Sequence, residues 1–177
     1  MQFRPSDIEY LLIGNDRQKQ AYNAIHAIGL FEKLSLYSPL LAGTIPLDID
    51  TDSSDLDIIC DSANLKEFTA LVRQSFGGFS NFECGGSLVR NEPSFIARFH
   101  AYNFDFELFC QKVPVLKQFA VLHLHAEARL LALGGSQSQN AIRELKKSGI
   151  KTEPAFAQYF NIQGDSYLEL AKIAALS

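Results

Sequence analysis

The sequence predicts a mixed α/β fold that is followed by an all-helical region. In the first part of the chain, short apolar runs rich in aromatic and β-branched residues alternate with segments of helical periodicity. After Pro114 the apolar residues follow helical spacing through to the end. The composition, 47% hydrophobic and 20% charged, is typical of a folded globular protein. We therefore expect an α/β core over residues 1–113 and a C-terminal helical region over 114–177 that packs on this core.

The first elements are expected to alternate between helices and strands. They are a helix over 16–35, a strand over 37–45, a strand over 55–60 and a helix over 65–76. Asp16 and Asn64 can cap the two helices, and Gly77 would end the second. The first strand would end in a Gly-Thr turn, and a loop would connect it to the second.

The remaining elements are expected to be short strands and then helices. The strands are expected over 79–84, 87–91, 94–102 and 104–110, separated by Gly85-Gly86, by 91–93 and by Asn103. The helices are expected over 115–133, 138–148, 153–162 and 167–176. Gly134-Gly135 would end the first of these helices, Thr152 would open the third, and Asp165 or Ser166 would open the fourth.

Charge and composition restrict the classes of function. The net charge of −4 does not favour a general nucleic-acid-binding surface, because neutralising many phosphates needs a basic face. The three cysteines form no CxxC pair, which favours reduced thiols in the core over a disulfide framework or a zinc site. No apolar run is long enough for a membrane span, and the N-terminus lacks the apolar core of a signal peptide. We therefore expect no membrane partner and a cytoplasmic location.

Two carboxylates stand at the edge of the predicted buried strand. Asp55 and Asp57 are two residues apart, so in a strand they share a face, and their like charges need an offset such as a divalent cation. Asp105 and Glu107 show the same spacing in another predicted strand. If the two strands pair, three carboxylates could converge on one or two metal ions, for which Mg²⁺ is the usual choice. The alternative is a strand at a solvated edge, and the nearby Asp48, Asp50 and Asp52 are expected to lie in a solvated loop.

The stretch GTIPLDIDTDSSDLDII resembles the signature of the nucleotidyltransferase superfamily, which has the DNA polymerase beta-like fold. That signature is a Gly-Gly or Gly-Ser turn, a spacer, an Asp-x-Asp or Asp-x-Glu pair, and a third carboxylate on a later strand. Here Thr44 follows Gly43 in place of serine, and Ala42 stands where a first glycine is often found. The wider chain is similar to a bacterial family of this superfamily described as a domain of unknown function, through stretches such as FELFCQ, HAEARLL and GDSYLEL.

The resemblance implies a nucleotidyltransferase-like mixed sheet with flanking helices, and a magnesium-dependent transfer of a nucleoside monophosphate from a nucleoside triphosphate to an unknown acceptor hydroxyl. It implies two Mg²⁺ ions, with Mn²⁺ as a possible substitute. The implied catalytic residues and metal ligands are Asp55, Asp57 and Glu107, with Asp105 as the alternative third ligand. The implied substrate-binding residues are Gly43, Thr44 and Ser54, although Ser54 also suits a purely turn-forming role.

Two other functions remain open on the sequence alone. One is a non-catalytic module of the same fold that binds a nucleotide or a protein, which the absence of a strong basic clamp for a triphosphate would favour. The other is a metal-dependent phosphoester hydrolase. On the predicted helix over 115–133, His123 and Glu127 share a face, and we expect them to form a hydrogen-bonded structural pair rather than to line a substrate pocket.

Overall fold

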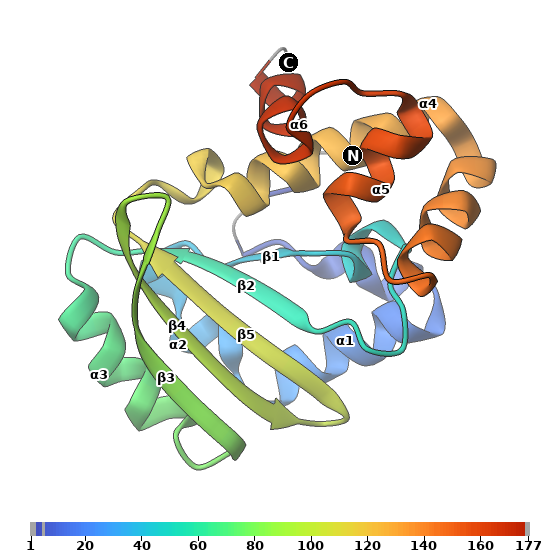
Figure 1. The fold of residues 1–177 in the computed structure, drawn as a ribbon. Helices are drawn as coiled ribbons and strands as arrows, with labels where there is room; N and C mark the ends of the chain where they lie inside the picture. The colour runs from blue at the N-terminus through green and yellow to red at the C-terminus, as the bar shows by residue number, and fades with distance from the viewer. Residues whose placement is uncertain (1–2, 5, 176–177) are drawn as a thin grey trace.

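The computed structural model describes residues 3–4 and 6–175 and shows a five-stranded mixed sheet with helices packed on it (Figure 1). The strand order is β1-β2-β5-β4-β3. β2 and β5 run parallel, and the other neighbours run antiparallel. The strands are β1 (Leu40–Ala42), β2 (Leu56–Asp61), β3 (Ser80–Val89), β4 (Glu92–Ala101) and β5 (Phe104–Gln111). The α-helices are α1 (Asp16–Ala27), α2 (Leu30–Lys33), α3 (Leu65–Phe76), α4 (Phe119–Lys147), α5 (Thr152–Phe160) and α6 (Ser166–Ala175).

Alternate residues of the central strands face two different apolar cores. On one face, Leu56 and Ile58 of β2 pack with side chains from α1, α2 and α3. On the other face, Ile59 of β2 packs with side chains of β1, α4, α5 and α6. Figure 1 shows the N-terminal helices and the C-terminal helices on these two sides of the sheet. Because Asp57 lies between Leu56 and Ile58, it shares the face that the C-terminal helices partly cover.

An aromatic stack fixes α3 against the sheet. The ring of Phe99 on β4 lies between Phe76 of α3 and Phe106 of β5, with ring centroids 5.4 and 4.9 Å away. Large buried rings supply much of the apolar area that a core removes from water. The face opposite the site is therefore tightly filled, which holds β5 in its position beside β2.

Most of the expected elements are present, but several in the first 113 residues differ from the prediction. The strand expected over 37–45 is shorter, Leu40–Ala42, because short 3-10 helices form at Ser35–Tyr37 and Ile45–Leu47. The helix expected over 16–35 is divided by Gly29, whose φ of +60° is left-handed, and Asn15 caps its first part. Gly85 and Gly86 do not separate two strands, because both lie inside β3 and pair with β4. The actual turns are two-residue loops at Arg90-Asn91 and Tyr102-Asn103, in which all four residues have positive φ, as tight hairpins require.

The C-terminal region agrees closely with the expected breaks. Gly135 (φ 63°, ψ −165°) interrupts the helical geometry of α4, which divides it into two helical stretches. Leu47 and Ile59 from the first part of the chain share an apolar cluster with Leu124 and Phe156 from the tail. The helical tail thus packs on the sheet through a common core, and the domain boundary at 113–114 stays a prediction.

Gln118 ties the start of α4 to the sheet. Its side-chain nitrogen donates hydrogen bonds to the carbonyl oxygens of Cys60 in β2 (2.7 Å) and Val113 (2.8 Å). Two carbonyl oxygens can only accept, so the amide orientation is fixed. Gln118 is 2% exposed, and these bonds set where α4 begins its passage over the acidic face.

We expect Gln118→Leu to lower the free energy of unfolding by about 1–3 kcal/mol, because two buried carbonyl oxygens would lose their donor. Urea unfolding followed by circular dichroism measures this change. Gln137→Leu, at an exposed position of the same helix, is the control and should change stability by less than about 0.5 kcal/mol. Equal effects of the two substitutions would show that Gln118 does not anchor α4.

Candidate active site

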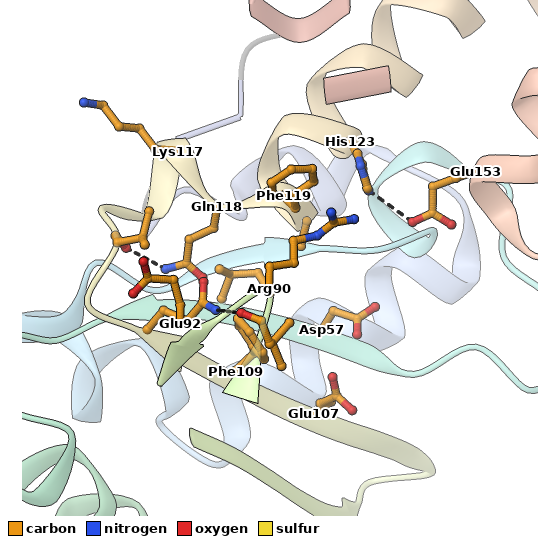
Figure 2. A pocket seen from close by; sticks show the side chains of 15 residues that line it. Asp57, Arg90, Glu92, Glu107, Phe109, Lys117, Gln118, Phe119, His123 and Glu153 are labelled. Carbon is orange, nitrogen blue, oxygen red and sulfur yellow. Dashed lines mark hydrogen bonds and ion pairs between the residues drawn. The ribbon is translucent and has the colours of Figure 1, made fainter. Parts of the chain in front are cut away.

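The parallel pairing of β2 and β5 brings two of the predicted carboxylates together. Asp57 and Glu107 are Cα partners across these strands, so their side chains leave the sheet on the same face. Asp55 immediately precedes β2 and, with Asp57 and Glu107, lines a cavity of about 730 Å³ that also includes Gly43 and Thr44. Figure 2 shows Asp57 and Glu107 side by side below α4. The structure thus collects the predicted acids and the Gly-Thr turn around one cavity.

Gly43 is in close contact with the acidic strand. Its neighbour Ala42 is the Cα partner of Asp57, and its own φ is +74°, in the left-handed region. A Cβ atom placed on Gly43 would lie 2.1 Å from Oδ2 of Asp57, so the Asp57 side chain would have to move. Glycine is therefore required both by the backbone conformation and by the approach of the Asp57 carboxylate.

Burial and like charges act together on Asp57. Its removal from water, with the nearby carboxylates of Asp55 and Glu107, raises the pKa of Asp57 to about 8, while Lys146 acts in the opposite direction. A carboxylate in this setting carries an unfavourable charge at neutral pH. A cation entering the cavity would relieve that repulsion.

The third carboxylate is engaged by an arginine. Glu107 Oε2 accepts a hydrogen bond from Arg98 Nη2 at 2.5 Å, and Arg98 also lies 3.6 Å from Glu83. The alternative ligand, Asp105, instead pairs with His100 at 2.8 Å and is largely exposed. Among residues 3–4 and 6–175, no group of three or more His, Cys, Asp or Glu side chains is arranged to hold a metal ion. The register places Glu107, and not Asp105, opposite Asp57, and Glu107 would have to turn from Arg98 to reach a shared ion.

Ser54 links the Gly-Thr turn to the following loop. Its hydroxyl accepts hydrogen bonds from Thr44 Oγ1 (3.1 Å) and from the backbone N–H of Thr51 (3.0 Å). Ser54 lines the cavity, but these bonds give it the turn-forming role that the sequence left open. Thr44 lines the same cavity.

The acidic loop is anchored, contrary to the sequence expectation of a solvated loop. Asp48 accepts hydrogen bonds from Asn15 (2.7 Å) and Arg143 (3.0 Å). The side chain of Asp50 is 13% exposed and lies 4.0 Å from Arg17. Asp52 is exposed as expected, and the side chain of Asp48 is 44% exposed despite its hydrogen bonds. The loop is therefore held between α1 and the second stretch of α4, which fixes the approach to Asp55.

The helical wall of the cavity contributes residues that the sequence did not identify. Lys146 lies near Asp50, Asp55 and Asp57, and its Nζ donates to the carbonyl oxygen of Ile49 at 3.0 Å. Burial lowers the pKa of Lys146 although the surrounding carboxylates favour its charged form. Lys151 lines the same cavity at the start of α5. These lysines carried no signal in the sequence, because most surface lysines are simply solvated.

His123 connects three helices and does not pair with Glu127, so that prediction was wrong. Its Nδ1 lies 3.1 Å from Oε1 of Glu153 in α5, and its Nε2 donates to the carbonyl oxygen of Tyr167 in α6 at 2.9 Å. Burial raises the pKa of Glu153, but the hydrogen bond from His123 and other favourable contacts outweigh it, so the net pKa is lowered. The lowered pKa favours the ionised form of the Glu153 carboxylate, and both imidazole nitrogens of His123 face hydrogen-bond acceptors on α5 and α6.

Glu127 is a buried carboxyl group in the wall of the cavity. It is 4% exposed, and among the described residues no hydrogen bond or ion pair involves its side chain. Burial is the main cause that raises its pKa well above the ordinary value, and Glu153 adds to this, while Lys146 opposes it. The raised pKa favours the protonated, uncharged form of the Glu127 carboxyl group in the cavity.

A second cavity adjoins the first and is shown in Figure 2; we call it the apolar slot. Its volume is about 410 Å³, and it extends from Asp57 and Glu107 toward the carboxyl ends of β2 and β5. Its apolar lining is Ile59, Val89, Phe109, Val113, Phe119 and Ala120. The two cavities share Asp57, Glu107, Ala120, His123 and Glu153. The acidic pair therefore stands where a polar cavity meets an apolar one.

Comparison with solved structures identifies the class of fold. The chain is similar to Cid1, described as having RNA terminal uridylyl transferase activity, with 12% identity, a TM-score of 0.50, and coverage of 95% of this chain and 49% of that chain. It also matches a chain of the GLD-2/RNP-8 complex, with 14% identity, a TM-score of 0.45, and coverage of 87% and 57%. The protein thus spans about half the length of these chains. Its fold is a nucleotidyltransferase-like mixed sheet with flanking helices, as the sequence predicts.

The family follows from the sequence match. Residues 23–173 match the family described as Domain of unknown function (DUF4269), and the chain belongs to that family. No curated protein matches the chain. Within the part of the chain that the structure describes, no helix is long and apolar enough to cross a membrane.

We expect Gly43→Ala to lower the free energy of unfolding by about 1–2 kcal/mol, because alanine disfavours a left-handed φ and its Cβ would displace Asp57. Denaturant unfolding measures the change. Gly78→Ala is the control, since nothing lies within 4 Å of a Cβ at that position. A Gly43→Ala protein as stable as the wild type would contradict the close approach to Asp57.

Glu127 gives a prediction about pH. Its folded-state pKa is raised, so above the unfolded pKa of about 4.3 the unfolded chain loses a proton that the folded chain keeps. This group therefore makes stability fall as pH rises toward the folded pKa, by at most about 1.4 kcal/mol per pH unit. Glu127→Gln should remove that part of the slope over the pH range from the unfolded pKa, about 4.3, up to the raised folded pKa. Urea unfolding across this range tests it, with Glu144→Gln, at an exposed position of α4, as the control. Identical slopes for Glu127→Gln and the wild type would contradict a neutral Glu127.

Proposed function

We propose that this protein is a metal-dependent nucleotidyltransferase of the DNA polymerase beta-like superfamily. It would transfer a nucleoside monophosphate from a nucleoside triphosphate to an acceptor hydroxyl. The observation that carries the proposal is the single cavity in which Asp55, Asp57 and Glu107 meet the Gly43–Thr44 turn. Asp57 is buried among like charges there, which is a setting that a divalent cation would stabilise.

The donor set fits magnesium or manganese. Carboxylate oxygens are the ligands that these ions prefer, and the pairing of Asp57 with Glu107 in register places donors from two strands on one face. Asp55, Asp57 and Glu107 would hold two Mg²⁺ ions, or Mn²⁺ in their place. The ions would activate the acceptor hydroxyl and offset charge on the triphosphate. Glu107 would exchange its bond to Arg98 for this role.

The other residues of the cavity have complementary roles. The backbone at Gly43 and the Thr44 hydroxyl would contact the β- and γ-phosphates. Lys146 and Lys151 would offset phosphate charge from the helical wall. In the transfer, the acceptor oxygen forms a bond to the α-phosphorus, the bond from that phosphorus to the bridging oxygen breaks, and pyrophosphate leaves with the electron pair. Glu107 would take the acceptor proton.

A non-catalytic nucleotide-binding module is the second candidate. The observation that favours it is the Arg98–Glu107 pair, which occupies the third carboxylate. Against it stand Lys146 and Lys151, which supply part of the basic clamp that the sequence did not reveal. Hydrolysis of a phosphate ester at the same site is a further outcome that the experiment below separates.

The net charge of the chain bears on the expected partners. We propose a small-molecule nucleoside triphosphate as the donor, and we also propose a cytoplasmic location. The net charge of −4 supports no general nucleic-acid surface, so the RNA activity described for Cid1 is not carried over to this chain.

The Asp55→Asn/Asp57→Asn double variant should weaken Mg²⁺-dependent binding of a non-hydrolysable nucleoside triphosphate on the order of 100-fold or more, because the metal loses two charged ligands. Equilibrium dialysis with Mg²⁺ or EDTA measures the binding, and circular dichroism checks that the variant is folded. Asp52→Asn, an exposed acid of the same loop, should leave binding unchanged.

Incubation with α-labelled or γ-labelled triphosphate and a small-molecule cell extract then separates the functions. Transfer of α-label with release of pyrophosphate supports the transferase. Release of phosphate without transfer would indicate a hydrolase, and binding alone would indicate a module without catalysis. Unchanged binding in the double variant would refute the site itself.

A further inference from the structure

From the acidic pair, the apolar slot and the larger cavity extend in opposite directions along β2 and β5. The larger cavity reaches from Asp57 to Asp55, Gly43 and Thr44, at the end where β2 begins. The slot reaches from Asp57 and Glu107 to Ile59 and Phe109, further along β2 and β5. Asp57 and Glu107 therefore separate a polar compartment from an apolar one.

The in-line geometry of the transfer indicates which cavity would hold the leaving pyrophosphate and which would hold the acceptor. In a displacement at the α-phosphorus, the attacking oxygen and the leaving pyrophosphate lie roughly in line on opposite sides of the phosphorus. The groups that suit pyrophosphate, the Gly43–Thr44 turn with Lys146 and Lys151, all belong to the larger cavity. With the α-phosphorus at Asp57 and Glu107, the attacking hydroxyl then comes from the side of the slot.

We propose that the apolar slot is the acceptor site, and that the acceptor is a small, largely apolar molecule bearing a hydroxyl group. This inference rests on the proposed transferase function and names its acceptor. The hydroxyl would stand at the Glu107 end of the slot, and the apolar body would lie against Phe109, Val89 and Val113. The acceptor oxygen bonds to the α-phosphorus as pyrophosphate departs, and its proton passes to Glu107.

The size and lining of the slot favour a small molecule over a polymer. Its volume of about 410 Å³ is within the range of roughly 300–1,000 Å³ that small-molecule pockets show. A site for a nucleic-acid end would need a basic groove with free aromatic faces. The slot offers Arg90 and Lys117 at its rim together with the acidic Glu92, and the guanidinium of Arg90 already lies over the ring of Phe119 at 3.7 Å. The hairpin of β3 and β4 contributes Val89, Arg90 and Glu92 to the lining of the slot.

The test uses 2-naphthol, an apolar body with one hydroxyl, as the probe. Saturation-transfer NMR and isothermal titration measure its binding to the full chain, and equilibrium dialysis measures Mg²⁺-dependent binding of the non-hydrolysable triphosphate in parallel. Val89→Trp fills the slot from the end of β3 and should weaken 2-naphthol binding about tenfold or more, since overfilling a packed site is costly. The same variant should keep the triphosphate affinity of the wild type, because Val89 does not line the larger cavity.

Leu88→Trp is the matched control, because Leu88 precedes Val89 on β3, is 73% exposed and does not line the slot. It should leave both affinities unchanged. Val113→Trp fills the slot from a second lining position and replaces Val89→Trp if that variant does not fold.

Three results would overturn the acceptor assignment: no binding of 2-naphthol to the wild type, equal binding by the slot-filling variants, or displacement of 2-naphthol by a short oligoribonucleotide. A protein that binds 2-naphthol in the slot but binds no triphosphate would instead refute the proposed transferase and leave the slot as a ligand site. Failure of the inference and failure of the proposed function are thus read from separate measurements.

Discussion

The parallel pairing of β2 with β5 is the constraint on which the site depends. It sets Asp57 opposite Glu107 and turns both side chains to the same face of the sheet. A shift of one residue in this register would move one of the two carboxylates to the other face, into the core formed with α1 and α3. The apolar residues that alternate with the acids, such as Ile58 and Leu108, prevent this shift because they are fully buried. The core on one face thus determines the chemistry on the other.

The helical tail completes the site by supplying charge of the opposite sign. Gln118 fixes the start of α4 to β2, and His123 joins α4 to α5 and α6. Lys146 then approaches the carboxylates from the end of α4, while the raised pKa of Glu127 disfavours a further negative charge in the cavity. The cavity thus has more acidic than basic side chains. This balance of charge would allow cations and an anionic ligand to enter together.

The sequence predicted the parts of the fold and site that depend on local spacing. The Asp-x-Asp spacing and the Gly-Thr turn predicted that Asp55 and Asp57 lie near Gly43, and the structure places them around one cavity. Alternation alone left Asp105 and Glu107 equivalent as the third acid, and the resemblance to the nucleotidyltransferase signature selected Glu107. The sequence did not predict contacts between side chains that lie far apart in the chain. Asp48 is bonded to Arg143, 95 residues away, and His123 selects Glu153 over Glu127, which is one helical turn away. Gly85 and Gly86 looked like a turn, but pairing with β4 holds them extended.

Because α4 is broken at Gly135, both of its helical stretches contribute residues to the region of the site. The stretch before the break carries His123 and Glu127 past the acidic face, and the stretch after it returns with Arg143 and Lys146 to the loop at Asp48 and Ile49. Gly135 is exposed, and its backbone geometry suits a connection more than a helix interior. A chain divided at this point would yield two fragments, one holding the carboxylates and the other the lysine. Their reassociation would be needed to restore the cavity, which makes this position a natural place to build a split reporter of the protein.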